Sequence, residues 1–253
     1  MSILLLDAGN TRIKWIFAED LGCLPAATWT YDEPWPQAWD ERTITAIWLS
    51  SVRAAAVDAE LSQGLQARYG CHVRQARSSA HACGVTNAYR QPERLGVDRW
   101  LAVLAAAARP GAALIIDAGT ALTIDALDAA GRHLGGRILP GQRLMIDALQ
   151  RHTAGIRIEA TLLSELSPGF ADHTAAAVAQ GVLSAQQGAV RLAYEQMGRL
   201  YPQGELRVLL TGGDGAALID LFPAACVEWD PDLVLRGLWR WGHDCDGGRA
   251  VPL

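Results

Sequence analysis

Cysteine is scarce and scattered in this chain of 253 residues. The five cysteines are odd in number and include no C-x-x-C pair. This pattern disfavours a disulfide framework and a zinc site, and it favours reduced thiols. The six histidines also lack any spacing suited to a metal site. We therefore expect a cytoplasmic protein.

Strong positive charge and long apolar runs are also missing. The formal net charge is −5 and no run of Lys or Arg occurs, so we expect no nucleic-acid partner. No apolar run approaches the roughly 20 residues of a membrane span, so we expect no membrane partner. Asp7 interrupts the first apolar stretch and no basic segment precedes it, which argues against a signal peptide.

Three common nucleotide and hydrolase motifs are absent as well. The sequence has no G-x-x-x-x-G-K-[ST], which excludes a P-loop enzyme. It has no G-x-G-x-x-G after a strand, which disfavours a dinucleotide site, and no G-x-S-x-G, which disfavours an α/β-hydrolase. Any nucleotide chemistry must use another motif.

One such candidate lies at the N-terminus, in the stretch 3–15. An apolar run ends at Asp7, a small polar turn follows, and a second apolar run begins at Ile13. This order predicts a buried strand, a tight turn and a returning strand. Gly9 lets the backbone approach a ligand closely, and Lys14 adds a positive charge. An ordinary hairpin would show the same pattern, so this stretch alone decides nothing.

A second copy of the pattern occupies residues 114–125. An apolar run again ends at Asp117, and Ala118-Gly119-Thr120 and another apolar run follow. An internal repeat of this kind predicts two related domains facing one another. Two such hairpins are what a site gripping phosphates would need.

The remaining elements suit α/β domains. We expect strands at 27–31 and 44–52, and helices at 54–69, 142–151 and 175–200. Arg109-Pro110-Gly111 breaks an alanine-rich helix, and we place the domain boundary there. The expected division is one domain over 1–110, a second over 111–241 and a flexible tail over 242–253.

Asp98 and Arg99 stand side by side where a helix is expected to begin. The helix dipole favours a carboxylate at that position, and such an Asp can accept a proton from a substrate hydroxyl. Arg99 can bind a carboxylate through two hydrogen bonds. The alternative is a helix-terminal Asp beside a surface Arg, with no functional role.

Taken together, these motifs resemble those of the type III pantothenate kinases, in the acetate and sugar kinase/Hsp70/actin superfamily. The resemblance runs from about Ser2 to Trp241, and its most specific parts are Asp7–Lys14, Gly96–Arg99, Asp117–Ala121, Gly135–Gly141 and Leu210–Asp214. It implies an α/β fold of two similar actin-like (ribonuclease H-like) domains with a nucleotide cleft between them.

The implied activity is ATP-dependent phosphorylation of pantothenate to 4'-phosphopantothenate, the first step of coenzyme A biosynthesis. By the same resemblance, Asp98 is the catalytic base. The ATP phosphates are held by Asp7, Ala8, Gly9, Asn10, Thr11, Arg12, Ile13, Lys14 and Thr120. Pantothenate is bound by Tyr89, Gly96, Val97, Asp98, Arg99 and Thr174.

The resemblance also implies two cations and a second subunit. Asp7 helps to place Mg²⁺, directly or through water, and Asp117 is a ligand of a monovalent cation, K⁺ or NH₄⁺. In that family the substrate pocket lies at a dimer interface, so the resemblance implies a homodimer. Two other functions stay open at this point, a regulatory accessory protein of the same fold (the Bvg accessory factor group) and a kinase for another small hydroxy acid.

Overall fold

The computed structural model describes residues 1–153, 155–156, 169–202 and 206–245. The predicted tail at 242–253 lies outside these residues from 246 onward. The chain forms two compact units. Unit 1 contains residues 1–110, 127–135 and 231–253, and unit 2 contains 111–126 and 136–230.

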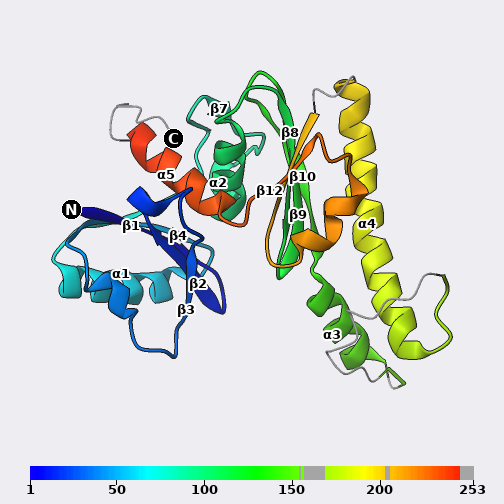
Figure 1. Cartoon of the computed structure of the whole chain (residues 1–253), viewed down its shortest axis with the longest axis horizontal. Coiled ribbons are helices and arrows are strands. Elements are labelled where there is room, and N and C mark those ends of the chain that lie inside the picture. Colours follow the sequence, from blue (N-terminus) through cyan, green and yellow to red (C-terminus); the bar gives the residue numbers. More distant parts are fainter. Residues whose placement is uncertain (154, 157–168, 203–205, 246–253) are drawn as a thin grey trace. The chain divides into compact units, whose positions relative to one another are not determined.

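Each unit contains a sheet of five strands, and the two sheets share one strand order (Figure 1). The first sheet has the order β3-β2-β1-β4-β5, and the second has β10-β9-β8-β11-β12. The strands of unit 1 are β1 (Ser2–Ala8), β2 (Arg12–Phe17), β3 (Ala27–Thr30), β4 (Ile44–Ser51) and β5 (Val73–Gln75). Those of the second sheet are β8 (Ala112–Ala118), β9 (Ala121–Leu127), β10 (His133–Pro140), β11 (Leu206–Thr211) and β12 (Val227–Trp229). The predicted repeat of an α/β unit is confirmed.

In both sheets, parallel strands end beside the turn that follows the first strand. In unit 1, β1 pairs antiparallel with β2 and parallel with β4, which places Asp7 opposite Lys14 on one side and Ser50 on the other. In unit 2, β8 pairs parallel with β11, which places Asp117 opposite Thr211. Ligands of open α/β sheets bind at the carboxyl ends of such parallel strands.

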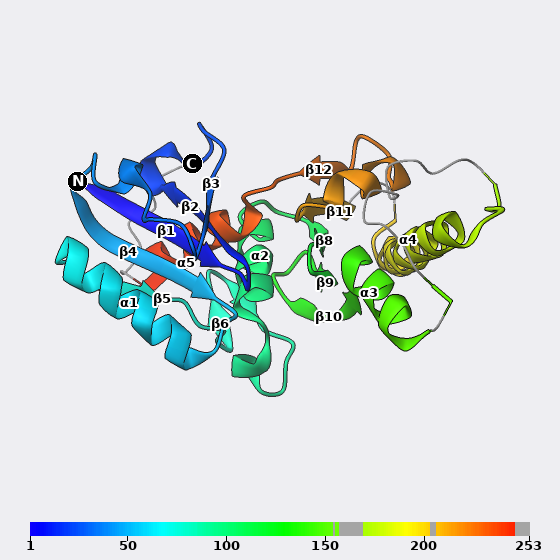
Figure 2. The same ribbon diagram turned by 90° about the horizontal axis from the view of Figure 1, so that it is seen from below.

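Helices cover both faces of the first sheet (Figure 2). Helix α1 (Ala55–Tyr69) packs on one face, and α2 (Val97–Ala106) and α5 (Leu233–Cys245) pack on the other. Gly70, in the left-handed conformation at φ 63°, ends α1 as the sequence predicts. The core beneath α1 is rich in tryptophan, with Trp39 fully buried among the rings of Trp15, Trp29 and Trp35.

Helix α5 approaches its neighbours very closely. A Cβ added at Gly237 would lie 1.9 Å from the Leu101 carbonyl oxygen, and one at Gly242 would lie 2.1 Å from the Trp48 ring. These glycines let α5 lie against α2 and β4, which explains why the end of the chain belongs to unit 1. The sequence predicted one division near residue 110 and a flexible tail from residue 242, whereas α5 extends to Cys245.

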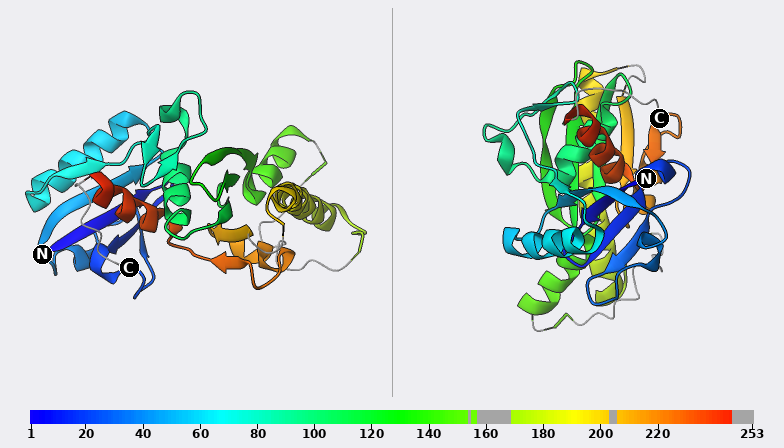
Figure 3. Two further views of the ribbon diagram at one scale, coloured as in Figure 1. Left: turned by 90° about the horizontal axis from the view of Figure 1, so that it is seen from above. Right: turned by 90° about the vertical axis from the view of Figure 1, so that its left-hand side faces the viewer.

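The second sheet is covered by the long helix α4 (Thr174–Leu200), which runs along it in Figures 1 and 3. Val190, Ala193 and Met197 of α4 pack on apolar residues of β8, β9 and β11. Helix α3 (Gln142–His152) contacts α4. Among the described residues, no helix is both long and apolar enough to cross a membrane.

The turn between β9 and β10, with the strand ends beside it (residues 127–135), belongs to unit 1. This turn is held by the buried Asp128, whose Oδ1 accepts hydrogen bonds from the Ala130 N–H (2.9 Å) and the Arg132 N–H (2.7 Å). The Thr86 N–H donates to the Gly131 carbonyl oxygen at 3.0 Å. The turn therefore supports the loop that precedes α2.

Candidate functional site

The first predicted phosphate turn follows β1. The Gly9 N–H donates to the Arg12 carbonyl oxygen at 3.0 Å, which closes the turn. Asp7 is half-buried at the end of β1, and its Oδ1 accepts a hydrogen bond from the Ser50 hydroxyl at 2.9 Å. The carboxylate is thus fixed at the carboxyl ends of two parallel strands.

The polar residues of this turn differ in their availability. Asn10, Thr11 and Arg12 are exposed, so their side chains can reach a ligand. Lys14 is the only lysine of the chain, and its Nζ donates to the Pro231 carbonyl oxygen at 2.7 Å. An ammonium group has three donors, so Lys14 can contact a phosphate while it keeps this hydrogen bond.

Two residues that the sequence did not indicate lie behind the turn. The Tyr31 hydroxyl donates to the Gly9 carbonyl oxygen at 2.7 Å, and the Arg53 Cζ lies 3.8 Å above the centre of the Tyr31 ring. Burial raises the pKa of Tyr31, although Arg53 acts in the opposite direction, so the hydroxyl keeps its proton and remains a donor. Both residues lie beside the turn through tertiary contacts, and no local sequence motif indicates such contacts.

The second turn, in unit 2, is also closed by a backbone hydrogen bond from the N–H of its glycine. The Gly119 N–H donates to the Ala121 carbonyl oxygen at 3.0 Å. The Gly141 N–H donates to the Thr120 carbonyl oxygen at 2.9 Å, and a Cβ at Gly141 would lie 2.2 Å from the Gly119 carbonyl oxygen. Gly141 is therefore required for this approach, and the Thr120 side chain is left exposed.

Asp117 is half-buried next to this turn. Gly212, at the end of β11, adopts φ +85°, and a Cβ there would lie 2.4 Å from Asp117 Oδ1. The glycine allows the β11 turn to pass beside the carboxylate. The sequence placed Gly212 in one motif of the family resemblance, Leu210–Asp214, and its contact with Asp117 was not predicted.

Asp98 lies in the first turn of α2, as predicted. Its Oδ1 accepts a hydrogen bond from the Arg99 N–H at 2.7 Å. Gly96 precedes the helix, and a Cβ there would lie 2.6 Å from the same Oδ1. A glycine at 96 therefore leaves room for the Asp98 carboxylate in its observed position.

Arg99 is not the surface residue of the alternative interpretation, since only 6% of it is exposed. Its Nη1 donates to the Tyr89 hydroxyl at 2.9 Å. The structure thus brings together three predicted substrate residues of unit 1, Tyr89, Asp98 and Arg99. A buried guanidinium beside a phenol is suited to hold a carboxylate away from bulk water.

The loop that carries Tyr89 is organised by Asn87, whose role the sequence did not show. The Tyr89 N–H donates to Asn87 Oδ1 at 2.9 Å, and Asn87 Nδ2 donates to the Ser79 carbonyl oxygen at 3.1 Å. An Asn two residues before an N–H partner is a common local turn, and this spacing was the available signal. The Tyr89 ring also lies nearly parallel to the buried His133 ring, at an angle of 16° and 6.3 Å between centres.

Thr174 is the first residue of α4 and is exposed. It belongs to unit 2, whereas the other predicted pantothenate residues belong to unit 1. Its contact with the substrate stays a prediction.

Two sheets of one topology, each with a tight Asp-Ala-Gly turn after its first strand, define an α/β fold of two similar actin-like units. The chain belongs to the type III pantothenate kinase family, whose model matches residues 3–196. This confirms the resemblance, the actin-like fold and the assignment as an ATP-using kinase.

The relatives match over nearly their whole length. A type III pantothenate kinase of Halorhodospira halophila is 39% identical over 252 residues, which cover 95% of this chain and 97% of the relative. One of Alkalilimnicola ehrlichii is 39% identical over 251 residues, covering 93% and 95%. A solved structure from Campylobacter jejuni, described as a conserved putative Baf family transcriptional activator, has a TM-score of 0.61 at 22% identity and covers 96% and 98%. It supports the fold alone.

Proposed function

We propose that this protein transfers the terminal phosphoryl group of ATP to the terminal hydroxyl of pantothenate, which yields 4'-phosphopantothenate for coenzyme A biosynthesis. The observation that carries the choice of acceptor is the adjacent pair at the start of α2. Asp98 offers a carboxylate at a helix N-terminus, and the buried Arg99 donates to Tyr89. An acceptor with a hydroxyl at one end and a carboxylate at the other needs one partner of each kind.

Asp98 acts as the general base in this proposal. It accepts the proton of the pantothenate hydroxyl as that oxygen forms a bond to the γ-phosphorus, and the bond from phosphorus to the bridging oxygen breaks to release ADP. Arg99 and Tyr89 hold the pantothenate carboxylate, and Gly96 and Val97 line the hydroxyl side. Thr174 supplies a further contact. Catalysis then consists mainly of positioning and charge neutralisation.

The Asp7–Lys14 turn and Thr120 hold the phosphates. Mg²⁺ usually takes one or two carboxylates together with water and substrate phosphates. Asp7 fits that role, because Ser50 occupies one of its oxygens and its position at the strand end is fixed. The described part of the chain contains no cluster of three or more His, Cys, Asp or Glu residues, and a magnesium site of this kind needs none. Bound Mg²⁺ would neutralise phosphate charge.

Asp117 holds the monovalent cation in this proposal, K⁺ or NH₄⁺. The supporting observation is its half-buried carboxylate, which closely packed backbone surrounds at Gly212 and Gly119. Oxygen ligands of this kind suit a hard cation.

We also infer that the protein works as a homodimer in the cytoplasm, where ATP is supplied. Unit 2 exposes several large apolar side chains on α3 and α4, which a second copy would cover: Leu144, Leu149, Leu192 and Leu200. Light scattering of the purified protein measures the molar mass of the assembly and so distinguishes a dimer from a monomer.

The activity is tested by incubating the protein with ATP, Mg²⁺ and K⁺ against a panel of small hydroxy acids. Release of ADP and the mass of the phosphorylated acceptor are followed, and pantothenate is expected to be the preferred acceptor. No transfer to pantothenate with transfer to another acid would make this a different hydroxy-acid kinase. No transfer to any acceptor would favour an accessory protein of this fold.

A further inference from the structure

The first phosphate turn carries two positive side chains of its own, Lys14 and Arg12. Lys14, the only lysine, donates to the Pro231 carbonyl oxygen. Arg12 is exposed. A triphosphate carries several negative charges, so an additional cation near Gly9 would favour its binding. Arg53, two residues after the end of β4, is in a position to supply it.

Arg53 is held next to the turn through Tyr31. The Tyr31 hydroxyl contacts the Gly9 carbonyl oxygen at 2.7 Å, and the Arg53 Cζ stacks 3.8 Å above the same ring. The backbone of Arg53 is fixed as well, since its N–H donates to the Ser51 hydroxyl at 3.2 Å. Stacking covers the flat face of a guanidinium and leaves the N–H groups at its edge able to donate.

The strand pairing puts Arg53 at the ligand end of the sheet. In the parallel pair β1–β4, Ala8 lies opposite Ser51, so the chain after Ser51 emerges beside the chain after Ala8. Gly9 and Arg53 are thus neighbours at the carboxyl ends of two parallel strands. This is the edge at which open α/β sheets bind phosphates.

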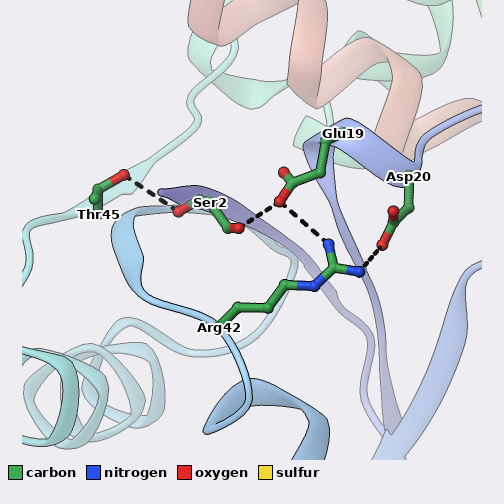
Figure 4. Close-up of polar contacts among 5 residues, drawn as sticks. All are labelled: Ser2, Glu19, Asp20, Arg42 and Thr45. Carbon is green, nitrogen blue, oxygen red and sulfur yellow. Dashed lines mark hydrogen bonds and ion pairs between the residues drawn. The ribbon is translucent and has the colours of Figure 1, made fainter.

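No ion pair joins Arg53 to a carboxylate among the residues that the structure describes. Asp58 is the nearby acid on α1, and its oxygens accept from Ser51 (2.7 Å) and Gln75 (2.8 Å). Arg42 gives a clear contrast (Figure 4). It also stacks on an aromatic ring, that of Phe17, but it pairs with Glu19 at 3.1 Å and Asp20 at 2.9 Å.

We propose that Arg53 is a phosphate-binding residue that contacts the terminal phosphates of ATP at the Gly9 turn, with its guanidinium oriented by the ring of Tyr31. This inference depends on the proposed function in one respect only, that the bound nucleotide is ATP. A purely structural Arg53 would stabilise unit 1 and would bind no phosphate.

The test compares nucleotide affinities by calorimetry, without pantothenate, for the native protein and three variants. Arg53→Gln should raise the Kd of MgATP about tenfold, the usual effect of losing a hydrogen bond to a charged group, and change the Kd of AMP less than about twofold. Arg53→Lys keeps the positive charge, so it should raise the Kd of MgATP by less than Arg53→Gln does. Arg42→Gln is the matched control, and it should leave both affinities unchanged.

Three outcomes would overturn the proposal: an unchanged Kd for MgATP, an equal loss for ATP and AMP, or an equal effect of Arg42→Gln. If Arg53→Gln does not fold, the comparison of Arg53→Lys with the native protein decides, since a phosphate contact predicts a loss specific to ATP. Turnover of pantothenate is measured separately. A native protein that binds ATP through Arg53 but transfers nothing to pantothenate would refute the proposed function and leave this inference standing.

Discussion

Gly96 controls the position of the proposed catalytic base, and Gly96→Ala tests that control. The added Cβ would lie 2.6 Å from Asp98 Oδ1, whereas ordinary van der Waals contact begins at 3.4 Å. The carboxylate must therefore move by about 0.8 Å. The backbone at Gly96 has φ −53° and ψ 133°, a conformation that alanine adopts readily, so the side chain of Asp98 takes up the change.

The expected effect is large for turnover and small for stability. A displacement of about 1 Å at a reacting group costs on the order of 100-fold in rate. This corresponds to about 2.7 kcal/mol of transition-state stabilisation. Because only the end of one flexible side chain moves, the free energy of unfolding should change by less than about 1 kcal/mol.

Steady-state kinetics with ATP and pantothenate measures the loss in kcat, and thermal unfolding measures stability. Gly198→Ala on α4 is the matched control, since no atom lies within 4 Å of its added Cβ. The double variant Gly96→Ala/Asp98→Asn should be no slower than Asp98→Asn alone, because both changes act on one carboxylate. Unchanged kcat in Gly96→Ala, or additive losses in the double variant, would refute the coupling.

Three further predictions follow from the same geometry. Asp98→Asn should retain ATP affinity, measured by calorimetry, but lose about 10²- to 10⁴-fold in kcat, and normal turnover would remove Asp98 as the base. Gly237→Ala should destabilise the protein by about 3 kcal/mol or more in chemical denaturation, because its Cβ would meet the Leu101 backbone at 1.9 Å and neither helix can yield cheaply. For Asp128, burial acts to raise its pKa, but hydrogen bonds from the Arg132 N–H and side chain and from the Ala130 N–H outweigh it and lower the pKa. The stability it adds is therefore full above the unfolded pKa of about 3.9 and is lost as pH falls through the lower folded value. The Tm difference between the native protein and Asp128→Asn should be constant from pH 7 to about 5 and shrink below about 4, and a difference that persists at pH 2 would contradict this.

Local patterns were sufficient to predict the two hairpins and most helices. An apolar run that ends at Asp-Ala-Gly favours a strand followed by a tight turn, and the turns at Gly9 and Gly119 are each closed by a hydrogen bond from the glycine N–H. Gly70 ends α1 because a left-handed residue is needed there. Each of these features depends on residues close together in the sequence.

Features that depend on distant residues could not be predicted. The contact between Lys14 and Pro231 joins residues 217 positions apart, and Tyr31 reaches Gly9 across 22. The membership of α5 in unit 1 follows from close packing at Gly237, and a glycine in a helix does not reveal which neighbour it approaches. The roles predicted for the site residues stay predictions until the variants are measured.

The return of the last helix to the first unit sets an order of assembly. On the ribosome, α2 is complete at residue 106, but its partner α5 begins only at residue 233, about 130 residues later. At a synthesis rate of roughly 5–20 residues per second, about 6–26 seconds pass before α5 can pack on α2 and on the Trp48 face of β4. All of unit 2 is synthesised by residue 230, within this interval. The unit that is begun first is thus finished last, and a nascent chain cannot complete the packing of α2, which carries Asp98, until α5 has emerged.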